Sequence, residues 1–298
     1  MRRGLPEMLL GLDHAIVAVR DLSAGMARLE GALGVTVTRG GEHPGRGTHN
    51  AIVRFGVQYL ELISVRNPAE ASTDPRGRVV LEATRAGDGL LGFAIGSDNI
   101  EADMAEASGR NVRLAGPITG GRNRPDGSVM TWRQAYLEDD PYGRVLPFLI
   151  QHDTPIEERR SWTPPEGHGL RVTGVPLVSV AVGNLESSTE AYRRLLGEPP
   201  EVVEEVPALP ARRTRFVLGN SRVELLQPAA TSGGLADFVA TQGDGLFMIT
   251  LSVPNLEEAV AFLRGRGTAV ANPTPRRRAP LLDPSQTLGA RFQLVEGR

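Results

Sequence analysis

The stretch Leu12–Leu22, LDHAIVAVRDL, is an apolar strand pattern that ends in an Asp-Leu step. The same pattern returns three times, as LLGFAIGSDNI at 90–100, VPLVSVAVGNL at 175–185 and GLFMITLSVPNL at 245–256. A repeat of this length indicates one supersecondary unit used four times. We name the four copies modules 1 to 4, so that equivalent positions can be compared.

Module 1 predicts a βαβββ unit. Residues 12–19 alternate and are rich in β-branched side chains, as a strand should be, and Asp21 is placed to cap a helix that ends at Gly34. The apolar positions of that helix recur at helical spacing: Leu22, Met26, Leu29 and Leu33. Three more strands are predicted at 35–39, 49–55 and 57–65.

Modules 2 to 4 predict the same unit. In module 2 we expect a helix at 100–108 and strands near Val112, at 131–137 and at 145–151. In module 3 we expect a helix after Asn184 and strands at 200–206, 213–218 and 222–227. In module 4, Asn255 and Glu258 match a capping box, and the last strand is predicted at 290–296.

The proline-rich stretch 154–172 is the expected linker between two domains. Residues 1–153 would hold modules 1 and 2, and residues 173–298 would hold modules 3 and 4. The predicted fold class is therefore α+β, with two modules paired in each domain.

The amino-acid composition excludes several classes of function and catalysis. The 298 residues carry a formal net charge of −2, which argues against a general nucleic-acid binder. The chain has no cysteine and no lysine, which excludes disulfides, thiolate chemistry and Schiff-base catalysis. No apolar run is long enough for a membrane span and no signal peptide is evident, so a cytoplasmic protein without membrane contact is expected.

The four modules resemble the vicinal oxygen chelate superfamily, which includes glyoxalase I, extradiol dioxygenases and the fosfomycin- and bleomycin-resistance proteins. Three segments are similar to its glyoxalase-like branch: HPGRGTHN at 43–50, YLEL at 59–62 and PFLIQ at 147–151. The resemblance implies that paired modules form cupped, incomplete barrels. It also implies a divalent metal at the centre, held by the first and last strands of each module.

Transferring this metal site position by position singles out module 1. The first-strand position falls on His14, Gly92, Leu177 and Met248. The last-strand position falls on Glu61, Phe148, Glu224 and Gln293. Only module 1 combines a histidine with a carboxylate, so the C-terminal half is expected to pack, to form a homodimer or to shape the pocket.

We therefore predict that His14 and Glu61 are catalytic and, with His152, ligate a divalent metal such as Mn, Fe, Ni, Co or Zn. The alternative is that His14 and Glu61 hydrogen-bond each other and only satisfy the interior, with His152 in an exposed loop. Ligand-binding residues are predicted at His43, Thr48, Asn50, Tyr59, Phe148 and Gln151. An ordinary glycine-rich turn is the alternative for the segment 43–50.

Two functions remain open from the sequence. The first is a metal-dependent lyase, isomerase or dioxygenase that acts on a small oxygenated substrate in the N-terminal cup. The second is a metal-free protein that binds or sequesters a small molecule. A third protein ligand beside His14 and Glu61 would favour the first.

Overall fold

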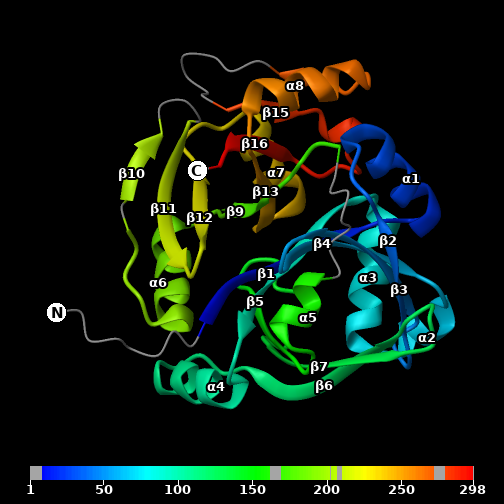
Figure 1. Ribbon diagram of the computed structural model, residues 1–298. Helices are drawn as coiled ribbons and strands as arrows, with labels where there is room; N and C mark the ends of the chain where they lie inside the picture. Colours follow the sequence, from blue (N-terminus) through cyan, green and yellow to red (C-terminus); the bar gives the residue numbers. More distant parts are fainter. Residues whose placement is uncertain (1–8, 162–168, 202, 207–209, 272–278, 298) are drawn as a thin grey trace.

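The computed structural model describes residues 9–161, 169–201, 203–206, 210–271 and 279–297. Within these ranges the four modules form two sheets that lie against each other (Figure 1). The predicted α+β fold with tandem modules is confirmed. No described helix is long and apolar enough to cross a membrane.

The N-terminal half contains modules 1 and 2. Module 1 consists of β1 (Leu9–Ala18), α1 (Leu22–Leu33), β2 (Thr38–His43), β3 (Thr48–Phe55) and β4 (Gln58–Val65). Module 2 consists of β5 (Gly89–Ser97), α4 (Ile100–Gly109), β6 (Ala115–Asn123), β7 (Val129–Tyr136) and β8 (Phe148–His152). Helices α2 (Pro68–Thr73) and α3 (Pro75–Ala86) join the two modules, and α5 (Ile156–Ser161) follows them.

The C-terminal half contains modules 3 and 4. Module 3 consists of β9 (Gly174–Ala181), α6 (Leu185–Leu196), β10 (Val203–Val206), β11 (Ala211–Leu218) and β12 (Ser221–Pro228). Helix α7 (Gly234–Gln242) leads to module 4. That module consists of β13 (Gly245–Val253), α8 (Leu256–Gly265), β14 (Val270–Ala271), β15 (Leu281–Leu282), a 3-10 turn at Pro284–Gln286 and β16 (Phe292–Glu296).

The repeated Asp/Asn step is a helix N-cap in every module. The side chains of Asp21, Asn99, Asn184 and Asn255 each accept a hydrogen bond from the backbone N–H three residues later. Such a cap satisfies a donor that the first helical turn leaves free. The signal is local, which explains why the repeat predicts the four helix starts correctly.

Helices α2, α3, α5 and α7 were not expected from the sequence. Asn67 and Asp74 cap α2 and α3, and a proline occupies the first turn of each. Proline at this position fits a helix because its missing N–H would have had no partner. Helix α5 lies within the expected linker 154–172. The strands predicted at 35–39 and near Val112 begin later, as β2 at Thr38 and β6 at Ala115.

The N-terminal sheet is a closed barrel in the order β1-β4-β3-β2-β6-β7-β8-β5. Modules 1 and 2 meet along the antiparallel pair β1 and β5, and again where Glu42 of β2 pairs with Asn123 of β6. The prediction of an incomplete barrel was wrong here, because β2 extends to His43 and reaches β6. The C-terminal sheet, in the order β10-β11-β12-β9-β13-β16-β15-β14, remains open.

Alternation along β1 separates two environments. Ala15 and Val17 belong to the large apolar core that also includes residues of the C-terminal half. Ile16 and Ala18 belong to a second cluster, with Phe148 and Ile150 of β8. His14 lines the same cavity as Ile16, as its position in the strand predicts.

Helices and one glutamine join the two halves. Arg266 of α8 donates to the carbonyl of Gly31 in α1, and Arg110 after α4 donates to that of Arg194 in α6. Between the sheets, buried Gln58 accepts from the N–H of Val175 at 2.8 Å. Its amide nitrogen lies 2.9 Å from the Ser221 hydroxyl and 3.2 Å from the Val175 carbonyl.

Replacing Gln58 with Leu should therefore destabilise the whole chain. The substitution leaves the backbone groups of Val175 without partners inside the joint, at a cost of about 1 to 3 kcal/mol in the free energy of unfolding. Urea unfolding followed by circular dichroism measures this, with exposed Gln242→Leu as the matched control. Equal stability of the two variants would contradict the role of Gln58 in holding the two sheets together.

Candidate functional site

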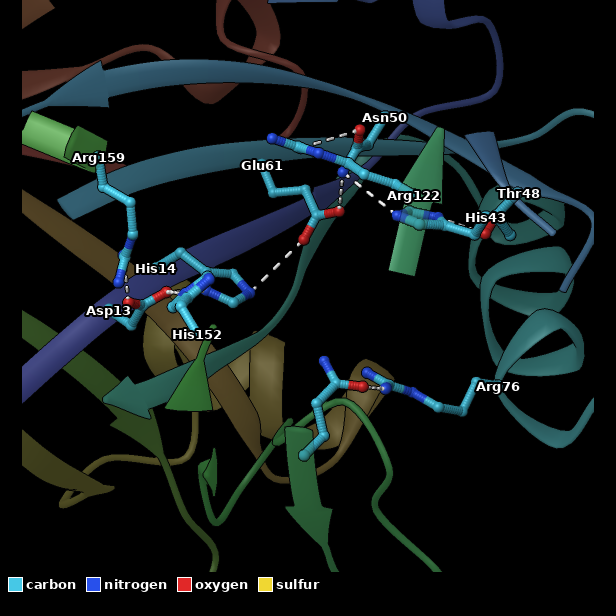
Figure 2. Close-up of polar contacts among 11 residues, drawn as sticks. Asp13, His14, His43, Thr48, Asn50, Glu61, Arg76, Arg122, His152 and Arg159 are labelled. Carbon is cyan, nitrogen blue, oxygen red and sulfur yellow. Dashed lines mark hydrogen bonds and ion pairs between the residues drawn. The ribbon is translucent and has the colours of Figure 1, made fainter. Parts of the chain in front are cut away.

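The N-terminal barrel encloses a polar cavity. The hollow measures about 530 Å³ including its opening to solvent. Both modules line it, together with Arg76 of α3 and Arg159 of α5. Figure 2 shows polar contacts around Asp13 and around Asn50, which are joined by the contact between His14 and Glu61, and a separate contact made by Arg76.

A β-bulge in β1 builds the first group. Leu12 pairs with Ile95 of β5 and His14 pairs with Ala94, so Asp13 has no partner of its own on β5. An extra residue of this kind breaks the alternation and redirects side chains. The Asp13 carboxylate can therefore lie beside the next residue, with its Oδ1 2.8 Å from Nδ1 of His14.

The Asp13 carboxylate contacts several positive and polar side chains. Arg159 donates to its Oδ2 at 2.7 Å, and Nε2 of His152 lies 3.1 Å from its Oδ1. Burial alone would raise the pKa of Asp13, but the neighbouring His152, His14 and Arg159 outweigh it and hold this pKa well below its usual range. Asp13 is therefore an ionised acceptor at neutral pH.

An ionised Asp13 selects which ring nitrogen of each histidine carries the donated proton. His14 donates from Nδ1, so in the neutral ring its Nε2 carries a lone pair. That atom faces Oε2 of Glu61 at 3.5 Å. Burial lowers the pKa of His152, which stays neutral and donates from Nε2 to Asp13. Its Nδ1 is buried without a hydrogen-bond partner in the described chain.

His14 and Glu61 are held from several sides. The His14 ring stacks on Tyr59, with centroids 4.5 Å apart, and meets the edge of Phe148. Asn50 donates to Oε1 of Glu61 at 2.6 Å, which leaves Oε2 turned toward His14. The structure thus places five of the predicted site residues around one cavity: His14, Asn50, Tyr59, Glu61 and Phe148.

The strand register confirms the alignment of the four modules. Glu61 pairs with Ile16, Phe148 with Ala94, Glu224 with Ser179 and Gln293 with Thr250. Two residues before these partners lie His14, Gly92, Leu177 and Met248, as predicted. In module 3, Glu224 accepts from Ser179 at 2.7 Å and from Arg215 at 3.1 Å, which satisfies this carboxylate without a histidine.

The residues of the barrel do not fit a divalent metal held by three protein ligands. Within the described ranges, no three His, Cys, Asp or Glu side chains are placed to hold an ion. In module 2, a Cβ on Gly92 would lie 2.0 Å from the Tyr142 carbonyl oxygen, and the other position is Phe148. His152, the predicted third ligand, instead uses Nε2 on Asp13.

The segment 43–50 contributes further polar contacts beside the cavity. Nδ1 of His43 lies 2.9 Å from the Thr48 hydroxyl, and its Nε2 lies 3.4 Å from the Asn50 amide nitrogen. His43 and Asn50 line the cavity, whereas Thr48 lies behind His43. Thr48 therefore orients His43 and does not reach the cavity itself, contrary to its predicted role as a ligand-binding residue.

Gln151 also differs from its prediction, because it does not line the cavity. Its side chain accepts from the N–H of Ile100 at 2.9 Å and donates to the Asp98 carbonyl at 2.9 Å. Strand alternation turns Gln151 away from Phe148 and Ile150, toward the start of α4. It therefore fixes that helix to β8.

Sequence reasoning missed the charged lining of the cavity. Five arginines line it, Arg46, Arg54, Arg76, Arg122 and Arg159, and Asp13 lies next to it in contact with His14. A charge inside an apolar strand, such as Arg54 in AIVRF, was the available signal. Arg76 and Arg159 lie on helices that the sequence did not predict, so no pattern placed them in the barrel.

Buried His43 predicts an acid-sensitive fold. Burial and the nearby Arg46, Arg122 and Arg76 hold the pKa of His43 well below its ordinary value. The unfolded chain takes up the proton near pH 6.5 and the folded chain does not, so the free energy of unfolding should decrease as pH falls below about 6.5. A His43→Asn variant should lose less, by up to about 1.4 kcal/mol per pH unit. Urea unfolding at pH 7, 6 and 5 measures this, and equal slopes for variant and wild type would contradict it.

Two curated proteins are similar to part of this chain. The chain is 35% identical over 91 residues to the mitochondrial methylmalonyl-CoA epimerase of Bos taurus, covering 29% of this chain and 50% of that protein. The corresponding figures for the Mus musculus enzyme are 33%, 29% and 49%. The chain thus spans about half the length of these curated relatives.

Solved structures share the fold over nearly the whole chain. A hypothetical protein from Staphylococcus aureus has a TM-score of 0.68 at 15% identity, covering 96% of this chain and 99% of that one. A mutant 4-hydroxymandelate synthase from Streptomyces coelicolor has a TM-score of 0.66 at 16% identity, covering 97% and 92%. Identities this low show the fold alone.

Two family models match the sequence. The model for the glyoxalase-like domain matches residues 12–196, and that for the glyoxalase, bleomycin resistance protein and dioxygenase superfamily matches residues 174–281. The first covers more than half of the chain and includes every residue of the cavity. The chain belongs to the glyoxalase-like domain family of the vicinal oxygen chelate superfamily.

Proposed function

We propose that the N-terminal barrel is the active site of an enzyme of lyase or isomerase type, which moves a proton on a small oxygenated molecule. One observation carries the proposal: ionised Asp13 accepts a hydrogen bond from Nδ1–H of His14, so that the Nε2 of His14 faces Glu61 across 3.5 Å. A bare imidazole nitrogen beside a buried carboxylate is an arrangement suited to general acid–base catalysis. His14 and Glu61 are the catalytic residues of this proposal.

The chemistry follows from the geometry. Nε2 of His14 takes a proton from a carbon next to a carbonyl, and the electron pair moves onto the carbonyl oxygen to give an enolate. Asp13 on one side and Glu61 on the other stabilise the imidazolium that forms. In a proton shift, the imidazolium then returns the proton to another atom of the enolate. In an elimination, the carbonyl re-forms as the bond to a leaving group on the next carbon breaks, and the imidazolium protonates the departing group.

The donor set favours this chemistry over a dioxygenase. A non-haem iron oxygenase holds its metal with two histidines and one carboxylate. Here the second histidine of the barrel, His152, donates to Asp13, and module 2 places Gly92 and Phe148 at the family's metal positions. Five arginines around the cavity also oppose a dication through charge repulsion.

A second candidate function is binding without turnover. Among the residues that the structure describes, no third ligand lies beside His14 and Glu61, and that ligand was the expected mark of a metal-dependent enzyme. A binding protein needs only the shape and polar groups of the barrel. The two functions differ in whether Glu61 is needed for a chemical step.

A Glu61→Gln substitution should separate them. Glutamine keeps an oxygen for the Asn50 bond but carries no negative charge to stabilise the imidazolium of His14, so exchange should fall by about 100-fold or more. The assay follows deuterium incorporation from D2O by NMR, with methylmalonyl-CoA, the substrate named for the curated relatives, and small oxo acids as probes. Glu224→Gln, the equivalent change in the open sheet, should leave exchange unchanged.

Two controls complete the experiment. Exchange by the wild-type chain should survive dialysis against EDTA, and elemental analysis should find no near-stoichiometric Mn, Fe, Ni, Co or Zn that is lost in a His14→Ala variant. Exchange that is equal in Glu61→Gln and wild type would contradict the enzyme proposal. Exchange abolished by EDTA would overturn the metal-free chemistry.

A further inference from the structure

Two buried guanidinium groups in the barrel have no carboxylate partner among the described residues. Arg76 at the start of α3 is 4% exposed, and Arg122 of β6 is 7% exposed. Arg76 donates to Gln134 and lies over the Tyr142 ring, 4.5 Å from its centroid. Arg122 contacts the Asn50 oxygen at 3.4 Å and the Met130 sulfur at 3.2 Å.

Two of the other cavity arginines are paired with acids. Arg159 pairs with Asp13 at 2.7 Å, and Arg46 lies 3.9 Å from Asp74. Burial lowers the pKa of Arg76 to about 10 and also lowers that of Arg122, but both remain protonated at neutral pH. Glu61 acts on both charges but forms no ion pair with either of them in the described structure. A buried cation without an ion-pair partner is costly, so an anion bound between these two would stabilise them.

Unused hydrogen-bond donors point to the same anion. Nε of Arg76, Nε of Arg122, Nε1 of Trp132 and the Tyr142 hydroxyl are buried without a partner in the described structure. All four residues line the one cavity. Buried polar groups are normally satisfied, and four orphan donors with two positive charges match the acceptor oxygens of an oxyanion.

We propose that the barrel binds the oxyanion group of its substrate, a carboxylate or a phosphate, between Arg76 and Arg122, with Trp132 and Tyr142 as further donors. This deepens the proposed function and rests on it, because the same cavity holds the catalytic pair. The hollow of about 530 Å³, which includes its opening to solvent, leaves room for a small molecule around this group.

The contacts of Asn50 also fix the position of the anion site relative to the catalytic carboxylate. Asn50 contacts Arg122 through its oxygen and Glu61 through its nitrogen, so one amide separates the anion site from the catalytic carboxylate. The substrate class is therefore a small acid whose exchangeable proton lies near its charged group. The same cations can stabilise negative charge that develops on a neighbouring enolate oxygen.

Thermal unfolding at constant ionic strength tests the site, with inorganic phosphate and malonate as probes and chloride as the reference. At least one probe should raise the Tm of the wild-type chain in proportion to its concentration. Arg76→Met and Arg122→Met should each weaken that binding by about 10- to 100-fold. Exposed Arg85→Met, on the same helix as Arg76, should bind as wild type.

A second readout separates binding from a structural role. Without an anion, Arg76→Met and Arg122→Met should unfold at or above the wild-type temperature, because each removes an uncompensated buried charge. Should a methionine variant fail to fold, Arg76→Lys and Arg122→Lys replace it, since lysine keeps the charge but loses the planar fork. Trp132 fluorescence in a Trp162→Phe background reports the same binding directly.

The outcomes are distinct. Stabilisation by malonate alone identifies a carboxylate site, and stabilisation by phosphate alone identifies a phosphate site. No stabilisation beyond chloride, or wild-type affinity in both methionine variants, would overturn the proposal. Anion binding that persists in Glu61→Gln without any proton exchange in wild type would sink the proposed function and leave the anion site standing.

Discussion

The hydrogen bond between Asp13 and His14 is the interaction on which the candidate site depends. It exists because a bulge in β1 turns two consecutive side chains toward each other, which a regular strand would keep apart. The bulge places a charge in the interior, and Arg159 from α5 and His152 from β8 gather around it. The orientation of His14, and hence the atom it presents to Glu61, follows from that arrangement.

Two similar modules form the barrel, and the residues by which they differ form the site. Module 1 contributes the imidazole and the carboxylate, whereas module 2 contributes Arg122, Trp132 and the aromatic wall around Phe148. Where the superfamily places metal ligands in module 2, the space beside Gly92 is filled by the backbone at Tyr142. The result is a cavity of arginines and hydrogen-bond donors that attracts an anion and disfavours a dication.

Much of the fold could be predicted because its signals are local. The N-cap at Asp21 and the alternation around Ile16 depend on neighbouring residues only. His14 and Glu61 could be found because the modules can be compared. Asp13 could not, since a bulge is set by the pairing of β1 with β5. Arg76 enters the barrel from an inserted helix, and closure depends on the distant pair of Glu42 and Asn123.

The most direct test of this arrangement is the tautomer of His14, measured by long-range nitrogen-to-proton NMR correlation on nitrogen-15-labelled protein at pH 7. The chain has five histidines, so a His14→Gln variant assigns the signal. A neutral ring protonated at Nδ1, with a bare Nε2, is the predicted result, and Asp13→Asn should remove this preference. A ring protonated at Nε2 in the wild-type chain would contradict the orientation by Asp13, and with it the proposed role of His14 as the base.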